Sequence, residues 1–262
     1  MLFKTNTFST LVRQFILTLL AVLFVIPLII MLIVSFRGEG IGNYVAVLTH
    51  SLFPGFFINS LVVSISTVAV VFVFTLTAAY AFSKLNLPLK NVLLNASLIG
   101  LMLPPIALIV PIFMLIRDLG LFNNYLALIG PMSAFITPFT LLMAKNYMDD
   151  LPNQLLDAAK IDGCGSFRAL LYVIAPLCKP ISVVVIIWAF LNSWNEYFLA
   201  LVFMRDEEMR MITQAPQYFS DAYTVDIGKV FAALVLISLP VMIAYLSMQK
   251  YFEDGMTSGS IK

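Results

Sequence analysis

Long stretches without a charged side chain divide this sequence, and they restrict the chain to one kind of solvent. A helix needs about 20 mainly apolar residues to cross the hydrocarbon core of a bilayer. Five runs that contain no Asp, Glu, Lys or Arg reach that length, at residues 14–36, 55–83, 91–116, 119–144 and 230–249. A sixth run, residues 181–203, carries a single charged side chain, Glu196. The pattern predicts an all-α integral membrane protein with six transmembrane helices.

The composition agrees with a membrane protein and argues against other classes. Hydrophobic residues make up 61% of the chain and charged residues 11%, whereas roughly a quarter of a soluble domain is charged. The net charge of +1 leaves no basic cluster for a phosphate backbone, so we expect no nucleic-acid partner. Cys164 and Cys178 are too few for a disulfide framework. The first apolar run exceeds the core of a secretory signal, about 7–15 residues, so we expect it to be retained.

The distribution of basic residues predicts how the helices are oriented. We place the spans at about residues 14–36, 58–82, 92–116, 122–144, 181–203 and 229–250, in a single transmembrane domain covering 1–262. With the N-terminus inside, ten of the 15 Lys and Arg residues fall in inner segments and five in outer ones. Inner loops of membrane proteins are enriched in these residues. We therefore predict that both termini and the loop at 145–179 are cytosolic.

Residues 154–180, between the fourth and fifth spans, form the longest interruption of the apolar pattern on the predicted cytosolic side. A first helix places four residues on one face, namely Leu155, Ala158, Ala159 and Asp162. Gly163 and Gly165 are suited to ending it, and Ser166 is suited to capping a second helix. The apolar face of this second helix consists of Phe167, Leu170, Leu171 and Ile174. Periodicity alone leaves two interpretations open, a rigid hairpin held by another protein and a loop lying on the lipid headgroups.

The hairpin residues also carry a family resemblance. The sequence Asp-Ala-Ala-Lys-Ile-Asp-Gly at 157–163, followed by Ile174-Ala175-Pro176, resembles the EAA signature in permease subunits of bacterial binding-protein-dependent ABC importers. Asp157 and Ala175 depart from the usual Glu and Leu. The sugar-importing subgroup is matched further at Asn59-Ser60, Ala79-Tyr80-Ala81-Phe82, Leu119-Gly120-Leu121, Pro138-Phe139 and Trp194-Asn195-Glu196. Residues 250–259 are similar to the tail of the smaller maltose-transporter-type permease.

This resemblance implies a function, a set of partners and a location. The chain would be a permease subunit in the bacterial cytoplasmic membrane, working with a second homologous permease, two cytosolic ATPases and an extracytoplasmic solute-binding protein. The EAA helix of such permeases docks on the ATPase. The residues that we expect to couple to it are Asp157, Ala158, Ala159, Ile161, Asp162 and Gly163, with Ile174 and Pro176 in the returning helix. Residues 257–262 would also extend toward the ATPase, although a frayed end is almost equally expected.

The chain itself has no recognisable catalytic site. A P-loop needs Gly-x-x-x-x-Gly-Lys-Ser/Thr, and Gly228-Lys229, the only Gly-Lys pair, is followed by Val. We therefore expect no enzymatic activity and no cofactor here, with ATP and Mg bound by the partner ATPase. The only histidine, His50, has no acidic or cysteine neighbour in sequence, so we expect a surface position rather than a metal site.

Polar residues near the outer ends of the spans are candidates for contact with the transported molecule. They are Asn59, Asn192, Trp194, Asn195 and Glu196. Acids inside membranes usually face a cavity or a partner, so Glu196 could line the pathway or form a bond between helices. The loop at 205–229 is the candidate surface for the solute-binding protein, with a plain solvated connector as the alternative.

Two other classes of function are compatible with several spans. A self-sufficient secondary transporter normally shows internal repeats and several intramembrane ionisable residues. Here the only repeat is a faint similarity between residues 25–32 and 110–115, and a single acid lies within the spans. A membrane scaffold would explain the spans but not the Asp-Ala-Ala-Lys-Ile-Asp-Gly sequence.

Overall fold

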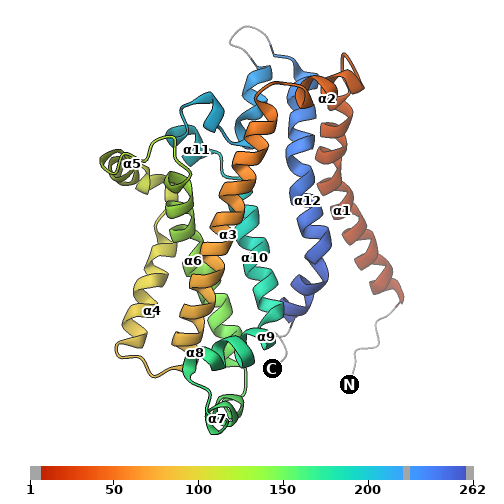
Figure 1. The fold of residues 1–262 in the computed structure, drawn as a ribbon. Helices are drawn as coiled ribbons and strands as arrows, with labels where there is room; N and C mark the ends of the chain where they lie inside the picture. Colours follow the sequence, from red (N-terminus) through yellow and green to blue (C-terminus); the bar gives the residue numbers. More distant parts are fainter. Residues whose placement is uncertain (1–6, 221–224, 258–262) are drawn as a thin grey trace. The chain divides into compact units, whose positions relative to one another are not determined.

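The computed structural model describes residues 7–220 and 225–257. The chain forms two compact units, the first made of Met1–Phe53 and Ala215–Ser238 and the second of Pro54–Gln214 and Leu239–Lys262. Within the described ranges all named elements are helical, and extended backbone pairs only at an isolated bridge between Ser220 and Val225 (Figure 1). Four described helices are long and apolar enough to cross a membrane, and two bent pairs raise the number to six if each is one span. The predicted all-α class is therefore confirmed.

Unit 1 contains the helices α1 (Thr7–Ser35) and α2 (Ile41–Leu48) and the first part of α12 (Ile227–Thr257). The last carbonyls of a helix lack partners within it and need other donors. Asn43 of α2 supplies them, because its Nδ2 donates to the carbonyl of Ser35 at 2.8 Å and to that of Arg37 at 2.7 Å. Gly228 lies against the same point, with its missing Cβ position 2.3 Å from the Arg37 oxygen. The end of α1, the start of α2 and the start of α12 are thereby packed together.

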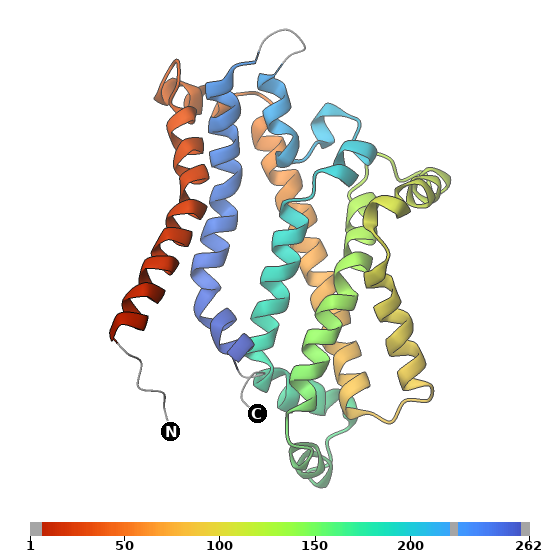
Figure 2. The same ribbon diagram turned by 180° about the vertical axis from the view of Figure 1, so that it is seen from behind.

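The centre of unit 2 consists of α3 (Phe53–Lys84), α6 (Leu126–Asp149) and α10 (Lys179–Trp194). These helices run alongside one another in both views (Figures 1 and 2). Their contact is mainly apolar and includes a polar link between fully buried hydroxyls, Thr75 Oγ1 and Thr140 Oγ1, 2.7 Å apart. This hydrogen bond favours one rotation of α3 against α6, since a slipped helix would leave the buried Thr75 hydroxyl without Thr140 as its partner.

The predicted third span, 92–116, is sharply bent rather than straight. α4 (Lys90–Ile99) continues through the turn η1 (Gly100–Met102), and η2 (Pro105–Leu108) leads into α5 (Ile109–Asp118) at 96° to the first part. The residue before a proline is pushed out of the helical region. Leu103 and Pro104 both precede a proline, and their ψ angles are 122° and 128°. The Pro104-Pro105 pair therefore breaks the span.

The predicted fifth span, 181–203, is also two helices. α10 ends at Trp194, and α11 (Phe198–Phe203) begins after a short break. Before α10 the chain passes through α8 (Ser166–Ala169), the π-helical turn η3 (Leu170–Ile174) and α9 (Ala175–Leu177), which meet α10 at 85°. The remaining elements are α7 (Gln154–Ile161), η4 (Glu207–Met209) and η5 (Ile212–Phe219).

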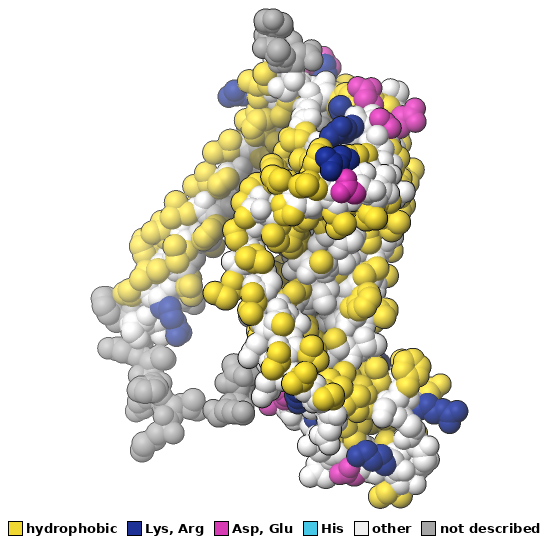
Figure 3. Space-filling view, turned by 90° about the vertical axis from the view of Figure 1, so that its left-hand side faces the viewer, with side chains coloured by type: hydrophobic (Ala, Val, Ile, Leu, Met, Phe, Trp, Pro, Cys, Tyr) yellow, Lys and Arg dark blue, Asp and Glu magenta, His cyan; other side chains and the backbone are white. Residues whose placement is uncertain are grey.

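Two apolar clusters stabilise the opposite ends of unit 2. One joins α3, α5, α6, α10 and α11 around residues such as Val63, Leu128 and Phe203. The other joins α3, α6, α7, η3 and α10 around Tyr80, Met148 and Ile174. Figure 3 shows a mainly hydrophobic surface along unit 2, with charged side chains gathered at its two ends. This is the distribution expected of a segment that spans a bilayer.

Candidate functional site

The predicted hairpin is present, and its turn depends on Gly163. After α7 the Cys164 N–H donates to the Ala159 carbonyl at 2.9 Å and the Gly163 N–H to the Lys160 carbonyl at 3.0 Å. This pair of bonds is the Schellman arrangement, in which the residue past the helix adopts a left-handed conformation. Gly163 has φ +78° and meets this need. Gly165 has φ −70° and serves instead as the N-cap of α8.

One face of the hairpin is packed into unit 2. Leu156 and Ala159 of α7, Leu170 and Ile174 of η3, and Cys178 are buried in the second apolar cluster. Lys84, at the end of α3, donates through Nζ to the Leu151 carbonyl at 2.7 Å and to Asn153 Oδ1 at 3.0 Å, just before α7 starts. The hairpin is therefore fixed to the ends of α3, α6 and α10 and would move with them.

The other face of the hairpin is exposed and unusually apolar. Ile161 is 87% exposed, Tyr172 75% and Phe167 68%. Asp157, Ala158, Asp162, Gly163 and Pro176 are exposed beside them. Asp157 makes only a surface ion pair, 3.3 Å to Lys160, which contributes little to stability. Exposed apolar surface bordered by polar groups is typical of sites where another molecule binds.

Some of the predicted coupling residues are buried and others are exposed, and two details of the hairpin differ from the prediction. Ala159 and Ile174 are buried, so they position the hairpin and leave the exposed residues for contact. Ser166 was predicted to be a cap, but it is the first residue of α8 and makes no capping bond. Phe167 and Leu171 were predicted to share a face with Leu170 and Ile174, yet they are exposed. The π-helical turn explains this, because its wider winding changes which residues align.

A cavity of about 400 Å³ lies between η2, α6, α10 and α11 of unit 2. Its wall is mainly apolar, with Ile106, Phe135 and Phe198 among its residues, and Asn192 and Glu196 supply the polar groups. The Asn192 Nδ2 donates to the Trp188 carbonyl at 2.8 Å. Glu196 Oε1 accepts the Leu199 N–H at 2.7 Å and so caps the start of α11. Two of the predicted pathway residues therefore meet at one cavity.

The other predicted pathway residues lie elsewhere. Trp194 is 1% exposed and packs between the rings of Phe57 and Phe190, with centroids 5.5 and 5.6 Å away. Asn195 is exposed, bonds to the Leu191 carbonyl at 2.9 Å and does not line the cavity. Trp188 lies one turn before Asn192 on α10, and sequence reasoning missed it. Its spacing was the available signal, since residues 188, 192 and 196 recur every four positions.

Asn59 is buried and holds the segment at 204–214. Its Nδ2 donates to the carbonyls of Glu208 and Arg210 at 2.7 and 3.0 Å, and its Oδ1 accepts the Tyr125 hydroxyl at 2.7 Å. The Asn123 Oδ1 accepts the backbone N–H groups of Arg205 and Asp206, at 2.6 and 3.0 Å. This segment is thus a fixed surface, with Asp206, Glu207 and Glu208 exposed on it. Tyr223, which also belongs to the predicted binding-protein loop, lies outside the described residues.

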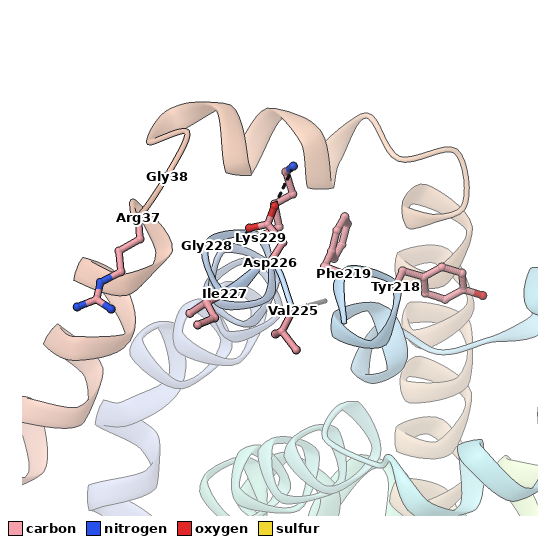
Figure 4. Close-up of a pocket in the computed structure, with 9 residues that line it drawn as sticks. All are labelled: Arg37, Gly38, Tyr218, Phe219, Val225, Asp226, Ile227, Gly228 and Lys229. Carbon is pink, nitrogen blue, oxygen red and sulfur yellow. Dashed lines mark hydrogen bonds and ion pairs between the residues drawn. The ribbon is translucent and has the colours of Figure 1, made fainter. Parts of the chain in front are cut away.

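A second cavity, of about 690 Å³, lies within unit 1 between the end of α1 and the start of α12. Lys229 lines this cavity, and its Nζ forms ion pairs with the carboxylates of Asp226 at 3.0 Å and Glu39 at 3.1 Å. Figure 4 shows Arg37 and Tyr218 directed away from that pair on opposite sides. The Lys229 ammonium holds the pKa of Asp226 below its ordinary value. Because its charges are paired or turned away, this cavity offers less to a ligand than the first.

His50 packs against the rings of Tyr218 and Phe219, with centroids 5.4 and 5.6 Å away. Across the part of the chain that the structure describes, no group of three or more His, Cys, Asp and Glu side chains could hold a metal ion. The two features that stand out are therefore the exposed hairpin face and the cavity beside Asn192.

Comparison with known proteins assigns the chain to a family. Residues 72–258, which include both features, match the family described as binding-protein-dependent transport system inner membrane component. The chain belongs to this family. With its several apolar helices, this inner membrane component is a multi-pass protein of the cytoplasmic membrane.

Several known proteins are similar to this chain over most of its length. A probable ABC transporter permease protein, YurM of Bacillus subtilis, is 36% identical over 84% of this chain and 73% of its own. The diacetylchitobiose uptake system permease protein NgcG of Streptomyces coelicolor is 28% identical over 94% of this chain and 87% of its own. A chain in the crystal structure of a bacterial ABC transporter for the acidic polysaccharide alginate has a TM-score of 0.82 at 23% identity, covering 96% of this chain and 99% of its own. This chain therefore has an ABC transporter permease fold.

Proposed function

We propose that this protein is the permease subunit of an ATP-driven importer of a sugar or sugar derivative, and that it forms half of the translocation pathway. The family match over residues 72–258 carries the proposal, because that family consists of transport components. The diacetylchitobiose permease among its relatives supports a carbohydrate cargo. A second homologous permease supplies the other half of the pathway, and two cytosolic ATPases bind ATP and Mg, so this subunit needs no ATPase site of its own.

The hairpin couples this subunit to the ATPase in our proposal. Its exposed face presents Asp157, Ala158 and Ile161, with Asp162 and Gly163 at the turn. Small side chains let another backbone approach closely, and Ile161 offers an apolar side chain to bury. The returning segment contains the buried Ile174 and continues past Pro176 into α10. A force that the ATPase applies to the exposed face would therefore be transmitted to α3, α6 and α10 through the buried face of the hairpin.

The proposed topology has six spans in one transmembrane domain, with both termini and the hairpin in the cytosol. The third span is the bent pair Lys90–Met102 and Pro105–Asp118. The fifth span takes only Lys179–Trp194 from the second bent pair, because Ser166–Leu177 belongs to the cytosolic hairpin. The bias of Lys and Arg toward the inner segments supports this orientation. Of the predicted C-terminal contact to the ATPase, residues 258–262 lie outside the described part of the chain.

The segment at 204–214 is the proposed contact for the extracytoplasmic solute-binding protein. Its backbone is fixed by Asn59 and Asn123, so it offers a preformed surface with three exposed acidic side chains. Preformed surfaces bind at lower entropic cost than mobile ones. Of the predicted pathway residues, Asn192 and Glu196 remain our candidates for contact with cargo.

The experiment that tests this function is reconstitution in vesicles with the partner subunits and the binding protein. Sugar uptake that requires ATP, together with co-purification of the ATPase, is the expected result. Replacing Ala158 with Trp should lower uptake while leaving the chain inserted, because a bulky side chain blocks close approach. Uptake by this chain alone, driven by an ion gradient, would instead favour a secondary transporter. A chain that recruits the partners but moves nothing would favour a scaffold.

A further inference from the structure

The cavity beside Asn192 contains hydrogen-bonding capacity that the protein does not use. Asn192 donates one N–H to the Trp188 carbonyl, and no described residue donates to its Oδ1. Glu196 uses Oε1 for the Leu199 N–H, and no described residue donates to its other oxygen. Asn192 is exposed and Glu196 half-buried, and polar groups set in a mainly apolar wall favour a ligand that completes their hydrogen bonds. Hydroxyl groups can do so, because each can donate as well as accept.

Aromatic side chains continue from the cavity along the same two helices. Phe135 lines the cavity, and Phe139 follows one turn later on α6. Trp188 precedes Asn192 by one turn on α10, is 36% exposed and lies 4.7 Å from the Phe139 ring, centroid to centroid. A ligand with hydroxyls on its rim and apolar faces fits polar groups beside flat rings. A pyranose ring has this character.

The charge of the cavity narrows the class of sugar. Its only ionisable lining residue is Glu196, and neither Lys nor Arg lines it. An anionic sugar would lose hydration on entering and would meet a carboxylate without a compensating cation. The volume of about 400 Å³ lies within the roughly 300–1,000 Å³ of small-ligand pockets. Both kinds of cargo occur among similar proteins, since NgcG belongs to a diacetylchitobiose uptake system and the alginate importer has the same fold.

We propose that this cavity is a sugar subsite selective for neutral over anionic rings, in which Asn192 and Glu196 bind ring hydroxyls and Phe135 packs on a face of the ring. The inference rests on the proposed function, because it assumes that a sugar reaches unit 2. It assigns a direct contact with cargo to this subunit. It also makes Glu196 the residue that excludes acidic sugars.

The test measures sugar binding to the assembled complex in nanodiscs without the binding protein, so that selection by that protein does not enter. The probes are radiolabelled maltotriose, raffinose and diacetylchitobiose, each beside a form oxidised to a uronate. We expect the wild-type complex to bind neutral probes and reject uronates. Asn192→Ala should weaken neutral binding roughly two- to ten-fold through one lost hydrogen bond. Glu196→Gln keeps an oxygen to cap α11 and should admit uronates.

The matched control is Asn195→Ala, which removes the same side chain and the same kind of helix bond outside the cavity. It should bind like wild type. Equal binding by Asn192→Ala and Asn195→Ala, a wild-type preference for uronates, or no binding of any probe would overturn the subsite. Failure of the proposed function shows separately, as the absence of ATP-dependent uptake in the complete complex with its binding protein.

Discussion

The Tyr125 hydroxyl donates a 2.7 Å hydrogen bond to the Asn59 amide oxygen, and so connects the start of α6 to the start of α3. The same amide holds the carbonyls of Glu208 and Arg210 through its nitrogen. One buried side chain therefore joins two membrane helices and the segment at 204–214. This relationship accounts for a fixed backbone in the segment at 204–214.

Replacing Asn59 with Ala should release the segment at 204–214. Leaving partly buried partners without hydrogen bonds costs up to about 1–3 kcal/mol, so we expect lower thermal stability in detergent. Tyr125→Phe removes one of the three bonds and should have the smaller effect. Trypsin cleavage after Arg205 and Arg210 measures the release directly. Unchanged cleavage in Asn59→Ala would show that other contacts hold this segment.

The two hairpin glycines should differ when replaced by alanine. Gly163 has φ +78°, a conformation that costs a residue with a Cβ about 1–2 kcal/mol. Gly165 has φ −70° and nothing within 4 Å of a built Cβ. Gly163→Ala should therefore lower transport per ATP hydrolysed, with Gly165→Ala close to wild type. If the two variants transported equally per ATP hydrolysed, the geometry of the turn would not contribute to coupling.

Gly228 should not tolerate a methyl group. A Cβ there would lie 2.3 Å from the Arg37 oxygen and 2.5 Å from the Asn43 Nδ2. Overpacking of this kind typically costs 1–3 kcal/mol. We expect Gly228→Ala to lower the melting temperature, measured by thermal unfolding in detergent. The control is Gly55→Ala, also in the first turn of a helix but with open space around the built Cβ. Similar melting of the two variants would contradict the close packing at Gly228.

Acid should loosen the start of α12 through Asp226. Its folded pKa lies below the ordinary value because of the Lys229 ammonium, and that ordinary value is about 3.9. A depressed folded pKa gives stability that is present above the unfolded value and is lost as pH falls through the folded one. Amide exchange near residue 229 should therefore rise below about pH 4. Asp226→Asn should lack this rise, whereas a rise in both forms would assign it to another group.

Much of the fold followed from the sequence because lipid imposes one strong requirement, long runs without charge. The bend at Leu103 was not predicted, since prolines within membrane helices are often tolerated and only tertiary contacts decide whether they kink or break a span. The side-chain directions were harder still. A helix turns about 100° per residue, so Trp188 and Trp194 both fitted an apolar run while only Trp188 has an exposed ring.

The hairpin shows the same division between pattern and packing. Its composition identified Asp157–Gly163 as distinctive but did not reveal that Ala159 faces inward and Ala158 outward. The π-helical turn at Leu170–Ile174 then changed the alignment of the second helix. A single inserted residue per turn leaves no sequence signal, so the exposed Phe167 and Leu171 could only be found from the structure.

Ile161 provides the sharpest test of coupling. At 87% exposed, it contributes almost nothing to the packing of this chain, so Ile161→Asp should leave insertion and melting unchanged. If the residue is buried against the ATPase, a charge there is costly to desolvate. We then expect at least a tenfold loss of ATPase co-purification and a matching loss of uptake. Ile41→Asp, at a 71% exposed isoleucine of α2 in unit 1, should retain the ATPase. Loss of the ATPase from both variants would indicate a general effect of the added charge, and retention in both would place the docking surface elsewhere than the exposed face of the hairpin.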